Sequence, residues 1–165
     1  MALLLHPYPT QKIDEFTYGF VTSKGIEYYC SFLSYAAYFS DQPDIAPYFF
    51  SFNLELKDKK IKLPAGTDKQ IADTAITIVG DFLASKSNAV VYVCDNSDGK
   101  EAARSKKFLS WFAYYDHPSS KIVKVTSNFT VGGLFIYSSL LVHKKNKRFN
   151  DMVFAYLELT KDDDK

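Results

Sequence analysis

A polar run follows an apolar segment near the middle of the chain, and its residue types could bind an anion. Asp95, Ser97 and Asp98 stand where the apolar segment ends, and Lys100 and Arg104 come shortly after. We expect a strand to end and a helix to begin here. Free backbone N–H groups and the positive dipole end favour anions at a helix N-terminus. The sequence therefore predicts that these five residues bind a phosphate or carboxylate ligand.

The same run also has a purely structural interpretation. Asp98 can cap the helix, Ser97 can form the turn, and the basic side chains can be a solvated helix face. A metal site built from Asp95, Asp98 and Glu101 is not expected, because these carboxylates serve the turn and the cap and no histidine lies nearby. The ligand site and the plain turn with its cap both stay open.

Aromatic residues are the second feature that could carry function. The chain has 14 Phe, 12 Tyr and 1 Trp, and they are dense between Tyr28 and Phe52. These rings either fill the core, with phenol groups reaching water, or line an interface. On the second interpretation Tyr35, Tyr38 and Tyr48 bind a protein partner. A nucleic acid is not expected, because the formal net charge is only +1.

No catalytic arrangement stands out. The three histidines, His6, His117 and His143, are scattered, and the sequence has no P-loop and no Rossmann glycine motif. The basic run from His143 to Arg148 is either a local anion patch or a solvated strand end. We therefore expect no catalytic residue, no metal and no cofactor, and a binding role rather than an enzyme.

Hydrophobic periodicity predicts the elements that position these residues. We expect a helix after Thr67, which has the spacing of an N-cap with Gln70, and a hairpin at Gly132-Gly133. The order β-β-β-α-β-α-β-β-α indicates an α+β fold with a mixed, mainly antiparallel sheet and helices packed on it. The expected strands cover residues 16–21, 26–32, 50–56, 89–94, 122–131 and 134–143, and the expected helices cover 68–85, a segment from about 98 and 150–159.

Length and composition set the limits of the fold. A chain of 165 residues with 47% apolar and 24% charged residues predicts one folded domain over 1–165, with frayed ends at about 1–10 and 160–165. We expect no signal peptide, no membrane segment and a cytoplasmic protein. Cys30 and Cys94 lie far apart in apolar runs and are expected as buried thiols.

The run from Asn88 to Lys100, together with Arg104, Trp111 and Phe112, resembles an uncharacterised family of short bacterial proteins, chiefly from Bacteroidota. That family is classed as a domain of unknown function. The resemblance covers most of the chain and implies a bacterial intracellular protein. It implies no particular activity.

The element order after the first hairpin resembles the core of GNAT-type N-acetyltransferases, and the segment 91–112 is similar to theirs. This resemblance implies an acyl-CoA-dependent N-acyltransferase. The chain departs from the family where a glycine-rich loop holds the CoA pyrophosphate, because residues 62–68 contain one glycine and the acidic Asp68. The two early helices of that family also have no clear counterpart.

We interpret the sequence as a small intracellular bacterial protein that acts as a non-catalytic binding or regulatory module. Its partner is a protein or a small anionic ligand. Two alternatives stay open: an N-acyltransferase with a degenerate cofactor loop, and a phosphate or nucleotide binder at the helix that begins near Asp98.

Overall fold

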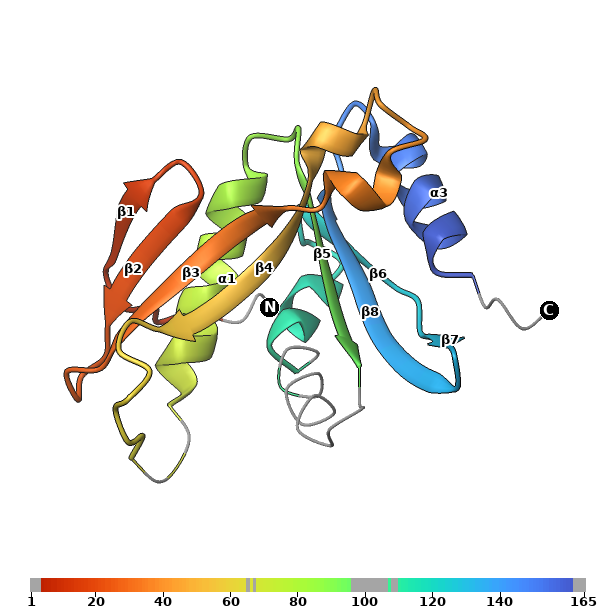
Figure 1. Ribbon diagram of the computed structural model, residues 1–165. Helices are drawn as coiled ribbons and strands as arrows, with labels where there is room; N and C mark the ends of the chain where they lie inside the picture. The colour runs from red at the N-terminus through yellow and green to blue at the C-terminus, as the bar shows by residue number, and fades with distance from the viewer. Residues whose placement is uncertain (1–3, 65, 67, 96–106, 108–109, 162–165) are drawn as a thin grey trace.

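The computed structural model describes residues 4–64, 66, 68–95, 107 and 110–161. These residues contain one mixed sheet of eight strands with helices on both faces (Figure 1), which confirms the predicted α+β class. The strands are β1 (Thr10–Asp14), β2 (Thr17–Val21), β3 (Glu27–Ser34), β4 (Phe49–Leu56), β5 (Ala89–Asp95), β6 (Ile122–Thr126), β7 (Phe129–Val131) and β8 (Leu134–His143). The helices are η1 (Ala36–Phe39), η2 (Ala46–Tyr48), α1 (Lys69–Leu83), η3 (Ala113–Asp116) and α3 (Phe149–Leu159).

The sheet order is β1-β2-β3-β4-β5-β8-β6. Strand β7 stands outside this order and pairs with residues 134–136 of β8, whereas β6 pairs with residues 139–143 of the same strand. Neighbouring strands are antiparallel except β4 and β5, which run parallel and are connected through α1. Their ladder joins Phe49–Ser51 to Ala89–Val91, although β4 continues to Leu56 and β5 to Asp95. Beyond this short ladder the two strands separate, as Figure 1 shows.

Strand β5 has a core on each side of the sheet. Val90 and Tyr92 belong to one buried cluster, while Ala89 and Val91 belong to the other. Because successive side chains of a strand point to opposite faces, the two clusters lie on opposite sides of the sheet. Helix α1 covers the first cluster, and η1, η2 and α3 cover the second (Figure 1).

Stacked aromatic rings fill much of the core under α1. Phe82 of α1 stacks on Phe32 with ring centroids 3.8 Å apart, and it also contacts Phe50 at 5.2 Å. Tyr92 and Phe112 continue the same cluster. Most of the dense aromatic stretch therefore serves packing, as the first of the two interpretations predicts.

The N-cap of α1 lies one residue later than predicted. The N-cap is Asp68, whose side chain accepts a hydrogen bond of 2.9 Å from the backbone N–H of Gln70, so the prediction of Thr67 is wrong. The Tyr8 hydroxyl also donates to Asp68, at 2.6 Å, and the Tyr8 backbone N–H donates to Thr74 Oγ1. The segment before β1 is thus attached to α1.

Two further differences from the predicted elements have physical causes. Strand β1 has five exposed residues and no apolar face, so alternation could not reveal it. The predicted strand 122–131 is divided at Ser127 and Asn128 into β6 and β7, both of which pair with β8. The predicted Gly132-Gly133 turn joins β7 to β8, and both glycines have the positive φ that such a turn requires.

Within the part of the chain that the structure describes, no helix combines the length and the apolar character needed to cross a membrane.

Replacing Phe82 by Ala should destabilise the protein by about 3–5 kcal/mol, because it removes a buried ring from the centre of the aromatic stack. Phe154 provides the matched control, since its side chain is 64% exposed on α3 and F154A should change stability by less than about 0.5 kcal/mol. Urea unfolding followed by circular dichroism measures both. Equal losses in the two variants would contradict this assignment of the core.

Candidate functional site

The predicted anion site lies mostly outside the described residues. Asp95 is the last residue of β5, as expected for a strand end, while Ser97, Asp98, Lys100 and Arg104 lie outside the described part of the chain. The site therefore stays a prediction.

The three tyrosines predicted to bind a partner lie close to one another around η1 and η2. Tyr38 is 59% exposed and stacks on the half-buried Tyr35 with centroids 4.2 Å apart. Burial raises the pKa of Tyr35 to about 12, so its phenol stays neutral. The Arg148 guanidinium lies 4.3 Å from the centre of the Tyr48 ring. Their role in binding a partner stays a prediction.

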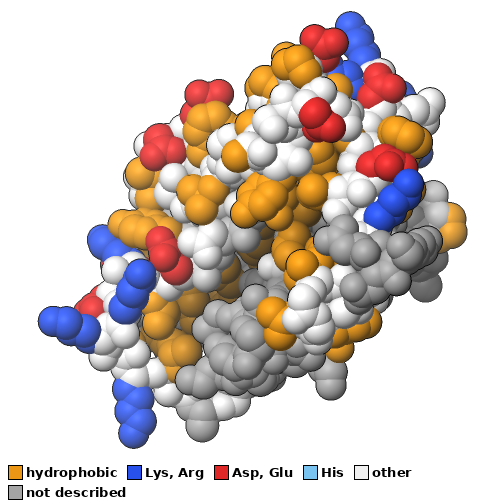
Figure 2. All heavy atoms as spheres, turned by 45° about the vertical axis from the view of Figure 1, so that its right-hand side comes forward, with side chains coloured by type: hydrophobic (Ala, Val, Ile, Leu, Met, Phe, Trp, Pro, Cys, Tyr) orange, Lys and Arg blue, Asp and Glu red, His pale blue; other side chains and the backbone are white. Residues whose placement is uncertain are grey.

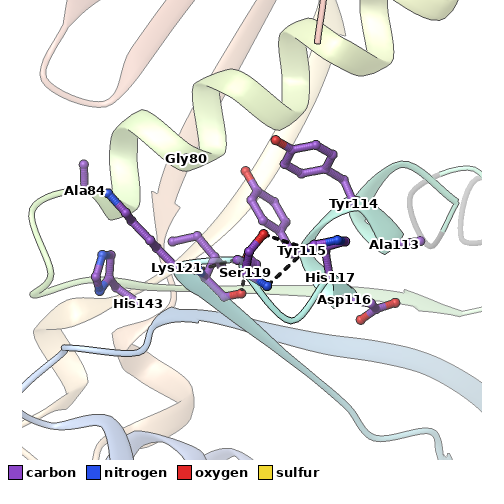
Figure 3. A pocket seen from close by; sticks show the side chains of 12 residues that line it. Gly80, Ala84, Ala113, Tyr114, Tyr115, Asp116, His117, Ser119, Lys121 and His143 are labelled. Carbon is purple, nitrogen blue, oxygen red and sulfur yellow. Dashed lines mark hydrogen bonds between the residues drawn. The ribbon is translucent and has the colours of Figure 1, made fainter. Parts of the chain in front are cut away.

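A cavity of about 640 Å³ opens between the C-terminal half of α1, η3 and the adjacent ends of β6 and β8 (Figure 3). This volume suits a small organic ligand. Its lining comes from three separate segments, and its surface is mainly apolar although two of the segments contribute polar side chains. The lining residues are Gly80, Ala84, Ala113, Tyr114, Tyr115, Asp116, His117, Ser119, Ser120, Lys121, Ile122 and His143.

Two small residues of α1 and two tyrosines make the apolar walls. Gly80 and Ala84 are one helical turn apart and therefore lie on the same face of the helix. The buried Tyr115 hydroxyl donates to the backbone carbonyl of Ile76, which fixes η3 against α1. A Cβ at Gly80 would come within 3.3 Å of that hydroxyl, so the absence of a side chain permits this close approach.

His117 lies in an exposed turn and is held by Ser119. The Ser119 backbone N–H donates to His117 Nδ1 at 3.1 Å, and the Ser119 hydroxyl lies 2.6 Å from the same nitrogen. The Ser120 hydroxyl donates to the Ile122 carbonyl at 2.7 Å and so orders the entry to β6. A ring whose Nδ1 accepts carries its proton on Nε2 when neutral.

His143 is the buried polar residue of the lining, with only 4% of its surface exposed. Its Nδ1 accepts a hydrogen bond of 3.0 Å from the Lys145 backbone N–H, so the neutral ring carries its proton on Nε2. Burial lowers the pKa of His143, and the charges of Lys86, Lys121, Lys145 and Lys144 lower it further. The ring is therefore neutral at pH 7 and lies in a positive field.

The charges at the cavity favour an anion. Asp116 is a lining carboxylate, and Lys124 pairs with it at 2.9 Å. Lys121 directly precedes β6. Its side chain extends towards Ala84 at the C-terminal end of α1, on the side of the cavity where His143 lies (Figure 3). Lys121 and the Nε2–H of His143 can stabilise a carboxylate or phosphate, and Lys86, Lys144 and Lys145 add positive charge near that ring without lining the cavity.

Sequence reasoning noticed the run from His143 to Arg148 but not the cavity. Gly80, the segment 113–122 and His143 are far apart in sequence, and only the fold brings them together. The local signal was a histidine at the end of an apolar strand beside several lysines. That signal left an anion patch and a solvated strand end both open, and it did not show which other residues lie beside the histidine.

A second, larger groove of about 990 Å³ runs along the N-terminal half of α1. Its walls include Tyr28, Ile71 and Trp111, and Lys107 lies 5.3 Å from the Trp111 ring. Asp68 and the buried Asp73 also line it.

Among the residues that the structure describes, no three histidine, cysteine or acidic side chains gather as a metal site.

The pKa of His143 should lie below the value of about 6.5 for an unperturbed histidine, because burial and the four lysines disfavour the imidazolium. NMR titration of the ring ¹⁵N shifts measures this pKa and also identifies the tautomer. We expect the proton on Nε2 at neutral pH. A midpoint above that of free histidine would contradict the assignment.

The chain matches a family of known proteins. The model described as a family of unknown function, DUF6169, matches residues 67–158, which confirms the predicted resemblance to a family without assigned activity. No curated protein matches the chain, and no solved structure matches it. The match covers more than half of the chain and includes every residue that lines the 640 Å³ cavity. The protein therefore belongs to DUF6169, a family of unknown function.

Proposed function

We propose that the protein is a non-catalytic binding module for a small organic anion, which occupies the cavity between α1, η3, β6 and β8. One observation carries the proposal: the apolar cavity contains Lys121 and His143, and three more lysines surround that histidine. The proposal includes the cytoplasm of a bacterium as the setting, and the free, buried Cys30 thiol suits the reducing conditions there.

The shape of the cavity supports a ligand with an apolar body and one acidic group. Gly80 and Ala84 leave room along α1, and Tyr114 and Tyr115 offer aromatic walls. The acidic group would lie towards Lys121 and His143. Apolar walls with a few convergent polar groups are typical of small-molecule sites, where the polar groups fix the orientation.

The hydrogen bonds of the two lining histidines support binding rather than catalysis. A general base needs a free lone pair within reach of the substrate proton. The Nδ1 lone pairs of His117 and His143 already accept backbone N–H groups of their own loops. In that tautomer Nε2 is a donor, so each ring can bind an anion but has no free nitrogen to accept a proton.

Benzoate, benzyl alcohol and benzylamine test the proposal because they share a ring and differ in charge. We expect benzoate to bind most tightly and benzylamine not at all. Lys121→Gln should weaken benzoate binding about fivefold, since removing one nearby charge costs about 1 kcal/mol in a solvated site. Ala84→Leu should abolish binding by filling the cavity. NMR shift perturbation gives both the dissociation constant and the location.

Lys57→Gln is the matched control, because Lys57 is an exposed lysine on the β3–β4 side that pairs with Glu27 at 3.3 Å. It should leave benzoate binding unchanged. The proposal fails if benzylamine binds as well as benzoate, or if Ala84→Leu has no effect on the affinity.

The sheet topology favours a second candidate, an acyl-CoA-dependent acyltransferase with a GNAT-like fold. Strands β4 and β5 are the parallel pair, they separate after a short ladder, and α1 connects them. The resemblance itself rests on the element order after the first hairpin, of which the described residues contain the early strands, α1, β5 and the last strands. Asp68 weakens this candidate, because its carboxylate already caps the N-terminus of α1, where the CoA pyrophosphate would need to lie.

Calorimetry with acetyl-CoA separates the two candidates. Binding that survives Ala84→Leu and strengthens in Asp68→Asn would support the acyltransferase, since the substitution removes a negative charge beside the pyrophosphate. The primary proposal predicts no heat from acetyl-CoA at millimolar concentration. Heat that disappears in Ala84→Leu would instead place the CoA anion in the smaller cavity.

A further inference from the structure

The turn between β8 and α3 depends on hydrogen bonds that begin at His143. The Lys145 backbone N–H donates to His143 Nδ1 at 3.0 Å, and the Asn146 N–H donates to the His143 carbonyl at 2.9 Å. The Asn146 side-chain oxygen then accepts from the Arg148 N–H at 2.8 Å, and its carbonyl accepts from the Phe149 N–H at 3.1 Å. Phe149 is the first residue of α3.

Asn146 connects this turn to the rest of the molecule. It is buried, and its Nδ2 donates to the Asn88 carbonyl at 3.5 Å and lies 3.6 Å from Met152 Sδ. Asn88 directly precedes β5, and Met152 is a fully buried residue of α3. The conformation of the turn therefore fixes the first turn of α3 against the sheet.

The start of α3 has no side-chain cap to replace the turn. The N-cap residue is Arg148, whose side chain makes no capping hydrogen bond and lies over the Tyr48 ring instead. The first helical N–H groups need partners. Here the Phe149 N–H finds its partner, the Asn146 carbonyl, within the turn.

The chemistry of the His143 ring makes this turn sensitive to acid. Nδ1 can accept the Lys145 N–H only while it is unprotonated, because protonation turns the nitrogen into a donor that faces another donor. The charges that act on the ring come from three segments: Lys86 after α1, Lys121 before β6, and Lys144 and Lys145 within the turn. All four oppose an imidazolium in the closed structure.

We propose that His143 is an acid-sensitive latch, whose protonation at Nδ1 breaks the contact with Lys145 and releases the N-terminal end of α3 from the sheet. The helix carries Met152, Ala155 and Tyr156 in one of the two cores, so its release exposes apolar surface. The latch acts without a ligand, although it uses the same His143 ring that the proposed anion site contains.

The direction with pH follows from the lowered pKa of His143. Above pH of about 6.5 the ring is neutral in both the closed and the released states, and the contact contributes its full stability. As the pH falls below that value, the released state binds the proton first, so the equilibrium between the two states shifts towards the released state. At pH of about 5 an unperturbed histidine favours the released state by at most about thirtyfold.

Hydrogen exchange of the full chain, followed by mass spectrometry, tests the latch. Protection factors, which remove the intrinsic pH dependence of exchange, are compared between pH of about 7.5 and 5. We expect the protection of residues 149–159 to fall several-fold, up to about thirtyfold, while α1 keeps its protection. Unchanged protection of 149–159 in the wild-type chain would overturn the proposal.

Three variants make the test specific. His143→Asn keeps an acceptor near the position of Nδ1 but cannot titrate, so its α3 protection should not respond to pH. His117→Asn is the matched control, because His117 accepts a backbone N–H from Ser119 in the same way but lies in an exposed turn, and it should keep the wild-type response. A pH response in His143→Asn equal to wild type would also overturn the proposal.

Lys86→Ala provides a measurement that leaves the histidine in place. Removing one of the charges that lower the pKa of His143 should bring that pKa closer to its value in the released state, so the loss of α3 protection at pH of about 5 should become smaller. This variant keeps the latch testable if His143→Asn does not fold. An unchanged or larger loss would show that the transition does not report this ring.

Discussion

The burial of β5 on both faces is the constraint on which the rest of the structure depends. Alternate side chains of this strand supply two separate cores, so the sheet must be covered on each side at this point. Helix α1 covers one side, and its position follows from the parallel pairing of β4 and β5, which requires a crossover connection. Helix α3 covers the other side, with the buried Tyr156 hydroxyl bonded to Ser138 at 2.7 Å. The turn between β8 and α3 lies at the start of β5, where Asn146 contacts Asn88, while the cavity lies beside the C-terminal half of α1.

Much of the fold was predictable because its signals are local. The strict alternation of 50–56, the apolar run 89–94 and the helical period after Asp68 each identify one element without its neighbours. Strand β1 gave no such signal, since an exposed edge strand needs no apolar face. The cap of α1 was misplaced by one residue because Thr67 and Asp68 are both good capping types, and the choice depends on Tyr8, which donates to Asp68 from a distant segment.

The cavity proposed as the site was not predicted from the sequence. The sequence predicted an anion ligand at Asp95, Ser97, Asp98, Lys100 and Arg104, none of which is among the described residues that line the cavity, and that prediction is untested. The sequence could not show where the cavity lies, because its lining combines three separate segments between Gly80 and His143. The grouping of apolar side chains on the surface could not be predicted for the same reason. Figure 2 shows apolar side chains in a hollow across one face, and residues that only the fold brings together leave no pattern in the sequence.

The short ladder between β4 and β5 divides the sheet into two antiparallel blocks. The first, β1 to β4, comprises residues 10–56 and lies outside the segment that matches the family, while the second, β5 to β8, lies inside it. Few backbone hydrogen bonds join the blocks, so the aromatic core under α1, where Phe32 and Phe50 contact Phe82, is the main connection between them. A change of side chain in the first block therefore reaches the cavity through the packing of α1 rather than through the ladder of the sheet.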